Sequence, residues 1–122
     1  MTDLSPRMIE KLEAIGYQIS TPPTTEVHFH GRRIGDYIMG ARHTPDLGRQ
    51  RAWKGALIHA ESLEGMKITM ADKVRWLSTT FPGFMVTVRT VDGKFNARVV
   101  EFRIAGADSP EAAVHALWES VP

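Results

Sequence analysis

The dipeptide Asp92-Gly93 constrains the fold of this chain more than any other feature of its sequence. It lies between two runs in which apolar and polar residues alternate, "FMVTVRTV" before it and "KFNARVVEFRIA" after it. Asp-Gly between two such runs is among the strongest local signals for a β-hairpin with a two-residue turn. We therefore predict an antiparallel hairpin with strands over 84–91 and 94–104.

The same alternation predicts which face of this hairpin is buried. A two-residue turn pairs Val91 with Lys94, and the other pairs follow in register. The face expected in the core carries Phe84, Val86, Val88, Phe95, Ala97 and Val99, and the face expected in solvent carries Thr87, Arg89, Asn96 and Arg98. Beyond Val99 the apolar residues change parity, so we expect a β-bulge near Arg98–Val100 that turns the later ones back to the core.

Helix start signals occur near both ends of the chain. Ser5 precedes Pro6, and Ser109 precedes Pro110. Each pair combines a favoured N-cap residue with proline at the first helical position. The apolar residues that follow recur at helical spacing in both cases, so both stretches are predicted helices.

Two more helices are predicted between these. One covers residues 50–64 and ends at Gly65, because glycine favours the left-handed conformation of a helix end. The other covers residues 70–79 and opens with Thr69 and Asp72, the T-x-x-D pattern of a capping box.

The remaining segments complete an α+β fold. Residues 25–30, "TEVHFH", alternate polar and apolar side chains and predict a strand, which residues 32–41 can follow as a second strand. Separate helices and antiparallel strands indicate an antiparallel sheet, including the C-terminal hairpin, packed by about four helices. A length of 122 residues with a hydrophobic fraction of 43% is typical of a single domain, here 1–122.

The composition excludes several classes of chemistry. The chain has no cysteine, which excludes disulfides, cysteine-ligated metal sites and thiol catalysis. No stretch is apolar over the roughly 20 residues that span a bilayer, and the N-terminal residues carry charges throughout. We therefore expect a cytoplasmic protein without membrane contact. The nucleophile-elbow, H-E-x-x-H, P-loop and Rossmann motifs are absent from the sequence, so we expect no enzyme activity and no cofactor.

His28 and His30 are the weak candidates for a metal site. Residues i and i+2 of a strand point to the same side, and imidazole is a common ligand of zinc. The other histidines, His43, His59 and His115, fall in a predicted loop and two predicted helices, so no later strand supplies a further ligand. A solvated strand face explains the spacing without a metal. A small metal-dependent enzyme that uses His28 and His30 is kept as an alternative.

The stretch from residue 32 to residue 54 is locally basic, although the formal net charge of the chain is only +1. Six cations, Arg32, Arg33, Arg42, Arg49, Arg51 and Lys54, stand against Asp36 and Asp46. Arginine favours bidentate contacts with carboxylate and phosphate groups over simple solvation. We predict that these six residues, the basic central segment, bind an acidic protein surface or a nucleoprotein complex. Direct binding of nucleic acid is the alternative, and a solvated basic face is the plain explanation.

The hairpin contributes Arg89, Arg98 and Arg103, which the expected bulge assigns to different faces. A final capped helix after a hairpin also occurs in double-stranded RNA-binding domains. That class needs a three-stranded sheet and a basic helix start, whereas the last helix here begins with "DSPEAA". The sequence therefore disfavours a double-stranded RNA-binding domain.

Residues 70–121, from "MADKVRWLSTTFPG" to "GADSPEAAVHALWESV", resemble a group of small phage-encoded accessory proteins described as α/β/α sandwiches. The shared features are a helix, a short antiparallel sheet and a terminal helix that opens with T/S-P-x-x-A, here Ser109, Pro110 and Ala113. The resemblance implies a mobile-element protein that acts by binding, and an anti-CRISPR-like inhibitor of a host defence complex is its most specific version. It implies no site residues. We predict a non-enzymatic binding module that acts through the basic central segment.

Overall fold

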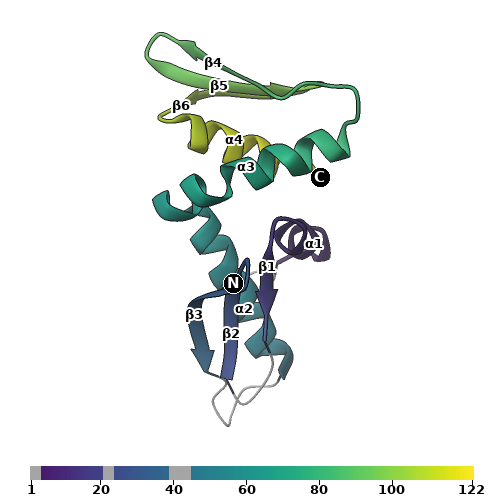
Figure 1. Cartoon of the computed structure of the whole chain (residues 1–122), viewed down its shortest axis with the longest axis vertical. Coiled ribbons are helices and arrows are strands. Elements are labelled where there is room, and N and C mark those ends of the chain that lie inside the picture. Colours follow the sequence, from purple (N-terminus) through teal and green to yellow (C-terminus); the bar gives the residue numbers. More distant parts are fainter. Residues whose placement is uncertain (1–3, 21–23, 39–44) are drawn as a thin grey trace. The chain divides into compact units, whose positions relative to one another are not determined.

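A computed structural model describes residues 4–20, 24–38 and 45–122. Helices and antiparallel sheets confirm the α+β class, and the strands form two sheets of three strands each (Figure 1). The chain groups into two compact units, Met1–His59 and Ala60–Pro122, and one domain over 1–122 stays a prediction. In the described ranges, no helix has the length and apolar character needed to cross a membrane.

The first unit contains a capped helix, a three-stranded sheet and most of a second helix. Its elements are α1 Pro6–Ala14, β1 Tyr17–Ile19, β2 Thr24–Phe29, β3 Arg32–Ile38 and α2 Pro45–Glu61, whose last two residues belong to the second unit. The predicted cap of α1 is confirmed, since Ser5 Oγ accepts a hydrogen bond from the Met8 amide over 3.1 Å. The strands pair antiparallel in the order β1-β2-β3.

The core of this unit gathers aromatic rings from β1, β2 and α2. The centroids of Tyr17 and Phe29 lie 4.7 Å apart, and the Tyr17 hydroxyl lies 2.8 Å from Nδ1 of His59. Burial raises the pKa of Tyr17, so its hydroxyl is neutral and hydrogen-bonded in the core. Trp53 is buried on the same helix as His59.

Gly16 joins α1 to β1 in a conformation that other residues rarely adopt. Its φ is 114°, and a Cβ atom at this position would lie 2.6 Å from Cε1 of the His30 ring. His30 follows β2 with a φ of 51° and donates its amide hydrogen to the Gly16 carbonyl over 3.0 Å. The positive φ therefore favours glycine at position 16, and a larger residue there would also have to displace the His30 ring.

Replacing Gly16 with alanine is expected to lower the free energy of unfolding by about 2–3 kcal/mol, because the substitution adds both backbone strain and a steric contact. Gly31→Ala is the matched control. Gly31 also has a positive φ, 78°, but a Cβ there would meet no atom within 4 Å. We expect the control to lose only about 1 kcal/mol. Urea denaturation measures both, and equal losses would contradict a steric role for His30.

The second unit has the order helix, three strands, helix. Its elements are α3 Leu63–Thr80, β4 Thr87–Val91, β5 Lys94–Val99, β6 Phe102–Ala107 and α4 Pro110–Ser120. The strands pair antiparallel in the order β4-β5-β6. Helix α4 packs against β5 and β6, and α3 packs against α4 (Figure 1). The buried core of this unit includes Ala97 and Val99 of β5 and Val114, Leu117 and Trp118 of α4.

The helix boundaries predicted over 50–79 are wrong. Helix α2 ends at Glu61, and Ser62 caps α3 by accepting a hydrogen bond from the Gly65 amide over 3.1 Å. Gly65 thus lies in the first turn of a helix rather than at a helix end. Thr69 is buried within α3, where its hydroxyl donates to the Gly65 carbonyl, so it does not begin a capping box. The cap formed by Ser62 therefore replaces both the predicted helix end at Gly65 and the predicted helix start at Thr69.

The pairing of the predicted hairpin is confirmed, but its second strand is shorter than expected. Val91 pairs with Lys94, and Val88 pairs with Ala97. No bulge carries the strand on to residue 104. Instead β5 ends at Val99, the chain turns, and Phe102 pairs back with Val99 as the first residue of β6. The chain itself ends in helix α4, so the hairpin is not its C-terminal element.

Candidate functional site

Three arginines lie on the face of the second sheet that points away from α4. Arg89, Arg98 and Arg103 come from β4, β5 and β6, one from each strand. Ala97 and Val99 flank Arg98 in sequence and are buried toward α4, so the alternation of a strand directs Arg98 to the opposite face. The register places Arg98 directly opposite Arg103. We call these three residues the arginine face.

The arginine face is electrostatically unbalanced. All three arginines are exposed, and none forms an ion pair within the ranges that the structure describes. Two like charges directly opposite each other on adjacent strands destabilise a sheet. Repulsion between Arg98 and Arg103 therefore destabilises the folded state unless an anion lies between them.

The surface over the arginine face is hollowed. The hollow has a volume of about 730 Å³, and besides the three arginines its lining includes the polar side chain of Asn96. Glu101 is its acidic member, and Phe84 and Met85 form an apolar border. Phe84 and Met85 are 56% and 79% exposed, although Phe84 was predicted to lie in the core. Cationic groups therefore lie beside large apolar side chains in one depression.

The structure distributes the basic central segment over two elements. Arg32 and Arg33 are adjacent on β3, so their side chains leave opposite faces of that strand. Arg49, Arg51 and Lys54 lie on α2, where the two arginines are exposed and Lys54 is half-buried. The sixth residue, Arg42, lies outside the described residues, as does His43. The segment is thus not a single strand or helix face.

His28 and His30 do not form the paired ligands that their spacing suggested. The ring of His28 lies on β2 with Nε2 3.0 Å from a carboxylate oxygen of Glu26. His30 follows the end of β2 in a left-handed conformation, and its ring packs on Phe29 with a centroid distance of 4.3 Å. The period of two residues, which would place both imidazoles on one face, ends before His30.

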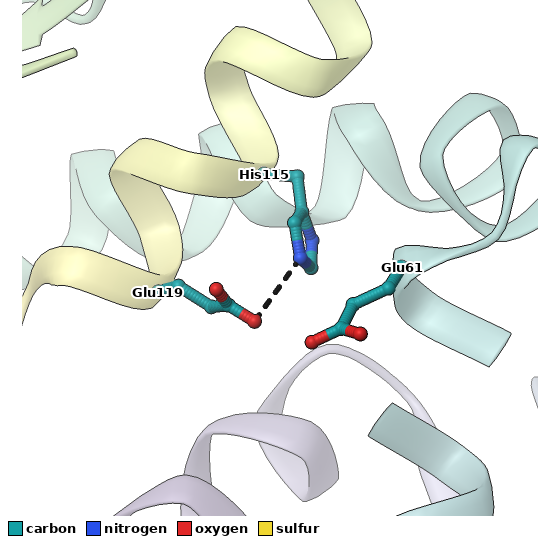
Figure 2. Close-up of side chains that lie close together, drawn as sticks. All are labelled: Glu61, His115 and Glu119. Atoms are coloured by element: carbon teal, nitrogen blue, oxygen red, sulfur yellow. Dashed lines mark ion pairs between the residues drawn. The ribbon is translucent and has the colours of Figure 1, made fainter. Parts of the chain in front are cut away.

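A second cluster of ionisable groups surrounds Lys73 in the same unit. Lys73 is completely buried, and its ammonium group donates to the Ala60 carbonyl over 3.1 Å and to Nδ1 of His115 over 2.8 Å. Nε2 of His115 lies 3.3 Å from a carboxylate oxygen of Glu119, which is on the next turn of α4 (Figure 2). The carboxylate of Glu61 extends below the ring toward Glu119 (Figure 2). We call Glu61, Lys73, His115 and Glu119 the Lys73 cluster.

Burial and repulsion shift the protonation equilibria of this cluster. Burial lowers the pKa of Lys73 to about 8, although the carboxylates of Glu119 and Glu61 oppose the shift. Burial raises the pKa of Glu61 to about 7, and hydrogen bonding to Glu119 and repulsion by its charge add to that shift. Glu61 and Glu119 therefore share a proton more readily than two solvated carboxyl groups would.

Glu61, His115 and Glu119 are also donor types that a transition metal accepts, and their ligand atoms lie within 4.8 Å of one another. A histidine that binds a metal usually donates its other ring N–H to an acceptor. Here the other ring nitrogen of His115 faces the buried ammonium group of Lys73. We therefore interpret Lys73 as the cation of this cluster. The expectation that the chain uses no cofactor stays a prediction.

The Lys73 cluster predicts a pH dependence of stability. The folded state raises the pKa of Glu61, so it binds a proton that the unfolded state has already released between about pH 4.5 and pH 7. This contribution is complete below that window and is lost as the pH rises through it. We expect Glu61→Gln to lose less stability than the wild type when urea denaturation is compared at pH 5 and pH 8. Equal losses in the two proteins would contradict the shift.

The Lys73 cluster is not among the sites predicted from the sequence, although the sequence contains two signals for it. His115 and Glu119 are four residues apart and therefore share one face of a helix. Lys73 occurs between Met70 and Leu77 on the apolar side of its helix, where a lysine is unusual. Lys73 meets His115 and Glu119 because α3 packs against α4, and the local sequence around these residues does not show that packing.

Comparisons with family models, with curated proteins and with solved structures gave no match to this chain.

Proposed function

We propose that this chain is a non-enzymatic binding module that engages nucleic acid through the arginine face. The proposal rests mainly on one observation: three arginines from three adjacent strands, which form no ion pair with any residue that the structure describes, line one hollow of the sheet surface. Guanidinium groups bind phosphate oxygens through two parallel hydrogen bonds, which makes arginine the favoured side chain for phosphate recognition. A bound phosphate would also neutralise the repulsion between Arg98 and Arg103.

A phosphate chain suits this geometry better than a single small anion does. The three arginines occupy three strands, and neighbouring strands in a sheet lie about 4.8 Å apart. Successive phosphates of a nucleic acid can contact such a row, and most contacts in protein–nucleic acid complexes go to phosphate and sugar. The apolar border formed by Phe84 and Met85 adds a surface that bases or sugars can contact.

Salt-dependent binding tests this function. Fluorescence anisotropy of labelled DNA and RNA oligonucleotides, single-stranded and duplex, gives the Kd between 50 and 200 mM salt. Three phosphate contacts predict that log K falls with log salt with a slope of about −2 for single strands and about −2.7 for duplex. The affinity then drops roughly 15- to 40-fold over that range. Absence of binding to every oligonucleotide at 50 mM salt would overturn the proposal.

A protein or nucleoprotein partner of the basic central segment is the second candidate function. The observation that favours it is the exposure of Arg32, Arg33, Arg49 and Arg51. Charge reversal by Arg32→Glu and Arg33→Glu should then abolish the capture of an acidic partner from the native host and leave oligonucleotide binding unchanged. A phage origin and a host defence complex as partner stay predictions drawn from the resemblance of residues 70–121.

A further inference from the structure

Two adjoining hollows of the second unit share the same apolar side chains. The first lies over the arginine face and includes Phe84 and Met85 in its border. The second has a volume of about 450 Å³ and is lined by Val74, Ser78, Gly83, Phe84, Met85 and Val86. That lining contains no charged residue. Phe84 and Met85 thus stand between a cationic depression and an uncharged one.

The position of Phe84 is defined by the end of α3. Its amide donates to the Phe81 carbonyl over 3.2 Å, which closes a turn through Pro82 and Gly83. Gly83 adopts a φ of 85° in this turn. The turn leaves Phe84 outside the sheet core with 56% of its surface in solvent. An aromatic ring is therefore presented at the edge of the phosphate-binding surface by a short, hydrogen-bonded turn.

We infer that the nucleic acid is single-stranded and that one unpaired base stacks on Phe84 while its neighbouring phosphates contact the arginine face. This inference rests on the proposed function. Stacking of an unpaired base on an aromatic ring, beside a cationic groove that follows the backbone, is the general mode of single-strand recognition. The uncharged second hollow accommodates the base, because a base has an apolar face and carries no charge.

A duplex would use these features less well. Its bases are stacked within the helix and present only their edges in the grooves, so the ring of Phe84 would have no base face to contact. The start of α4 is also acidic, with Asp108 before its N-cap and Glu111 in its first turn. These carboxylates do not attract the phosphates that a double-stranded RNA-binding domain contacts at this position.

Variants of Phe84 test the inference by fluorescence anisotropy with a single-stranded 12-mer and the duplex of the same sequence. Phe84→Ala should weaken single-strand binding by about 5- to 150-fold, the usual effect of removing one base–aromatic stack. Phe84→Leu keeps an apolar side chain without a ring and should lose nearly as much. Phe84→Trp should bind as well as the wild type. Phe84→Ala and Phe84→Leu should lose much less affinity for the duplex than for the single strand.

The outcomes separate this inference from the proposed function. Wild-type affinity of Phe84→Ala for the single strand would overturn the stacking role, as would an equal loss on single strand and duplex. Binding of the wild type to duplex alone would overturn the inference and leave the proposed function standing. Binding to neither would overturn both. Because Phe84 is largely exposed, circular dichroism of each variant should match that of the wild type.

Discussion

Replacement of Lys73 by methionine is expected to lower the free energy of unfolding by about 2–4 kcal/mol. The ammonium group satisfies two buried acceptors, the Ala60 carbonyl and Nδ1 of His115. Ala60 lies in the last turn of α2, where carbonyl groups lack partners within the helix. Methionine fills a similar volume but donates no hydrogen bond, so both acceptors remain buried and unsatisfied. Urea denaturation followed at 222 nm measures the loss.

Lys67→Met is the matched control for this substitution. Lys67 is exposed on the same helix, so the same chemical change there should alter stability by less than about 0.5 kcal/mol. The removal of a buried charge also relieves its desolvation, which is the effect that lowers the pKa of Lys73. A Lys73→Met protein as stable as the wild type would show that this relief exceeds the hydrogen bonds. The assignment of Lys73 as the stabilising cation of the cluster would then be wrong.

Reversal of charge at Arg98 and Arg103 together is expected to weaken oligonucleotide binding at least tenfold at 50 mM salt. Loss of two phosphate contacts should also reduce the salt slope for single strands by about 1.4. Arg32→Glu with Arg33→Glu carries the same change in net charge on β3 of the first unit. If this control weakens binding as much as the double variant of β5 and β6, then net charge rather than the arginine face explains the affinity.

The single substitution Arg103→Glu is expected to change oligonucleotide binding and the stability of the fold in opposite directions. It places a carboxylate directly opposite Arg98 and replaces a repulsive pair with an attractive one. We expect the free energy of unfolding to rise by about 0.2–1 kcal/mol while oligonucleotide binding falls. A gain in stability with a loss of affinity is typical of a position selected for binding. Loss of both would indicate a structural role for Arg103.

Much of the fold of the second unit follows from local signals, but its third strand does not. The Asp-Gly turn predicts the β4–β5 register because both of its residues favour a positive φ, which they adopt. The next turn is formed by Val100 and Glu101, which have no turn preference. Val100 has a φ of 54°, a conformation that β-branched residues rarely adopt. The parity change after Val99 is visible in the sequence, but it fits a bulge and a turn equally well.

The turn at Val100 and Glu101 determines which arginines share a face and so form the candidate site. An expected bulge separates Arg98 and Arg103 onto different faces, whereas the observed turn pairs them on one face. The basic central segment is predicted from the density of its cations in the sequence, and that density does not require a common surface. Three arginines spread over 15 residues form the more compact group because antiparallel pairing brings adjacent strands together. A local sequence pattern does not show which residues will face each other when separate strands pair.

Side-chain NMR of a ¹⁵N-labelled chain titrated with a single-stranded oligonucleotide tests the central claim most directly. The Nε–Hε resonances of arginine report guanidinium contacts one residue at a time. We predict that the largest shifts belong to Arg89, Arg98 and Arg103, and that resonances from Arg32, Arg33, Arg49 and Arg51 stay in place. Shifts confined to this second group, or no shift at a saturating oligonucleotide concentration, would contradict the assignment of nucleic-acid binding to the arginine face.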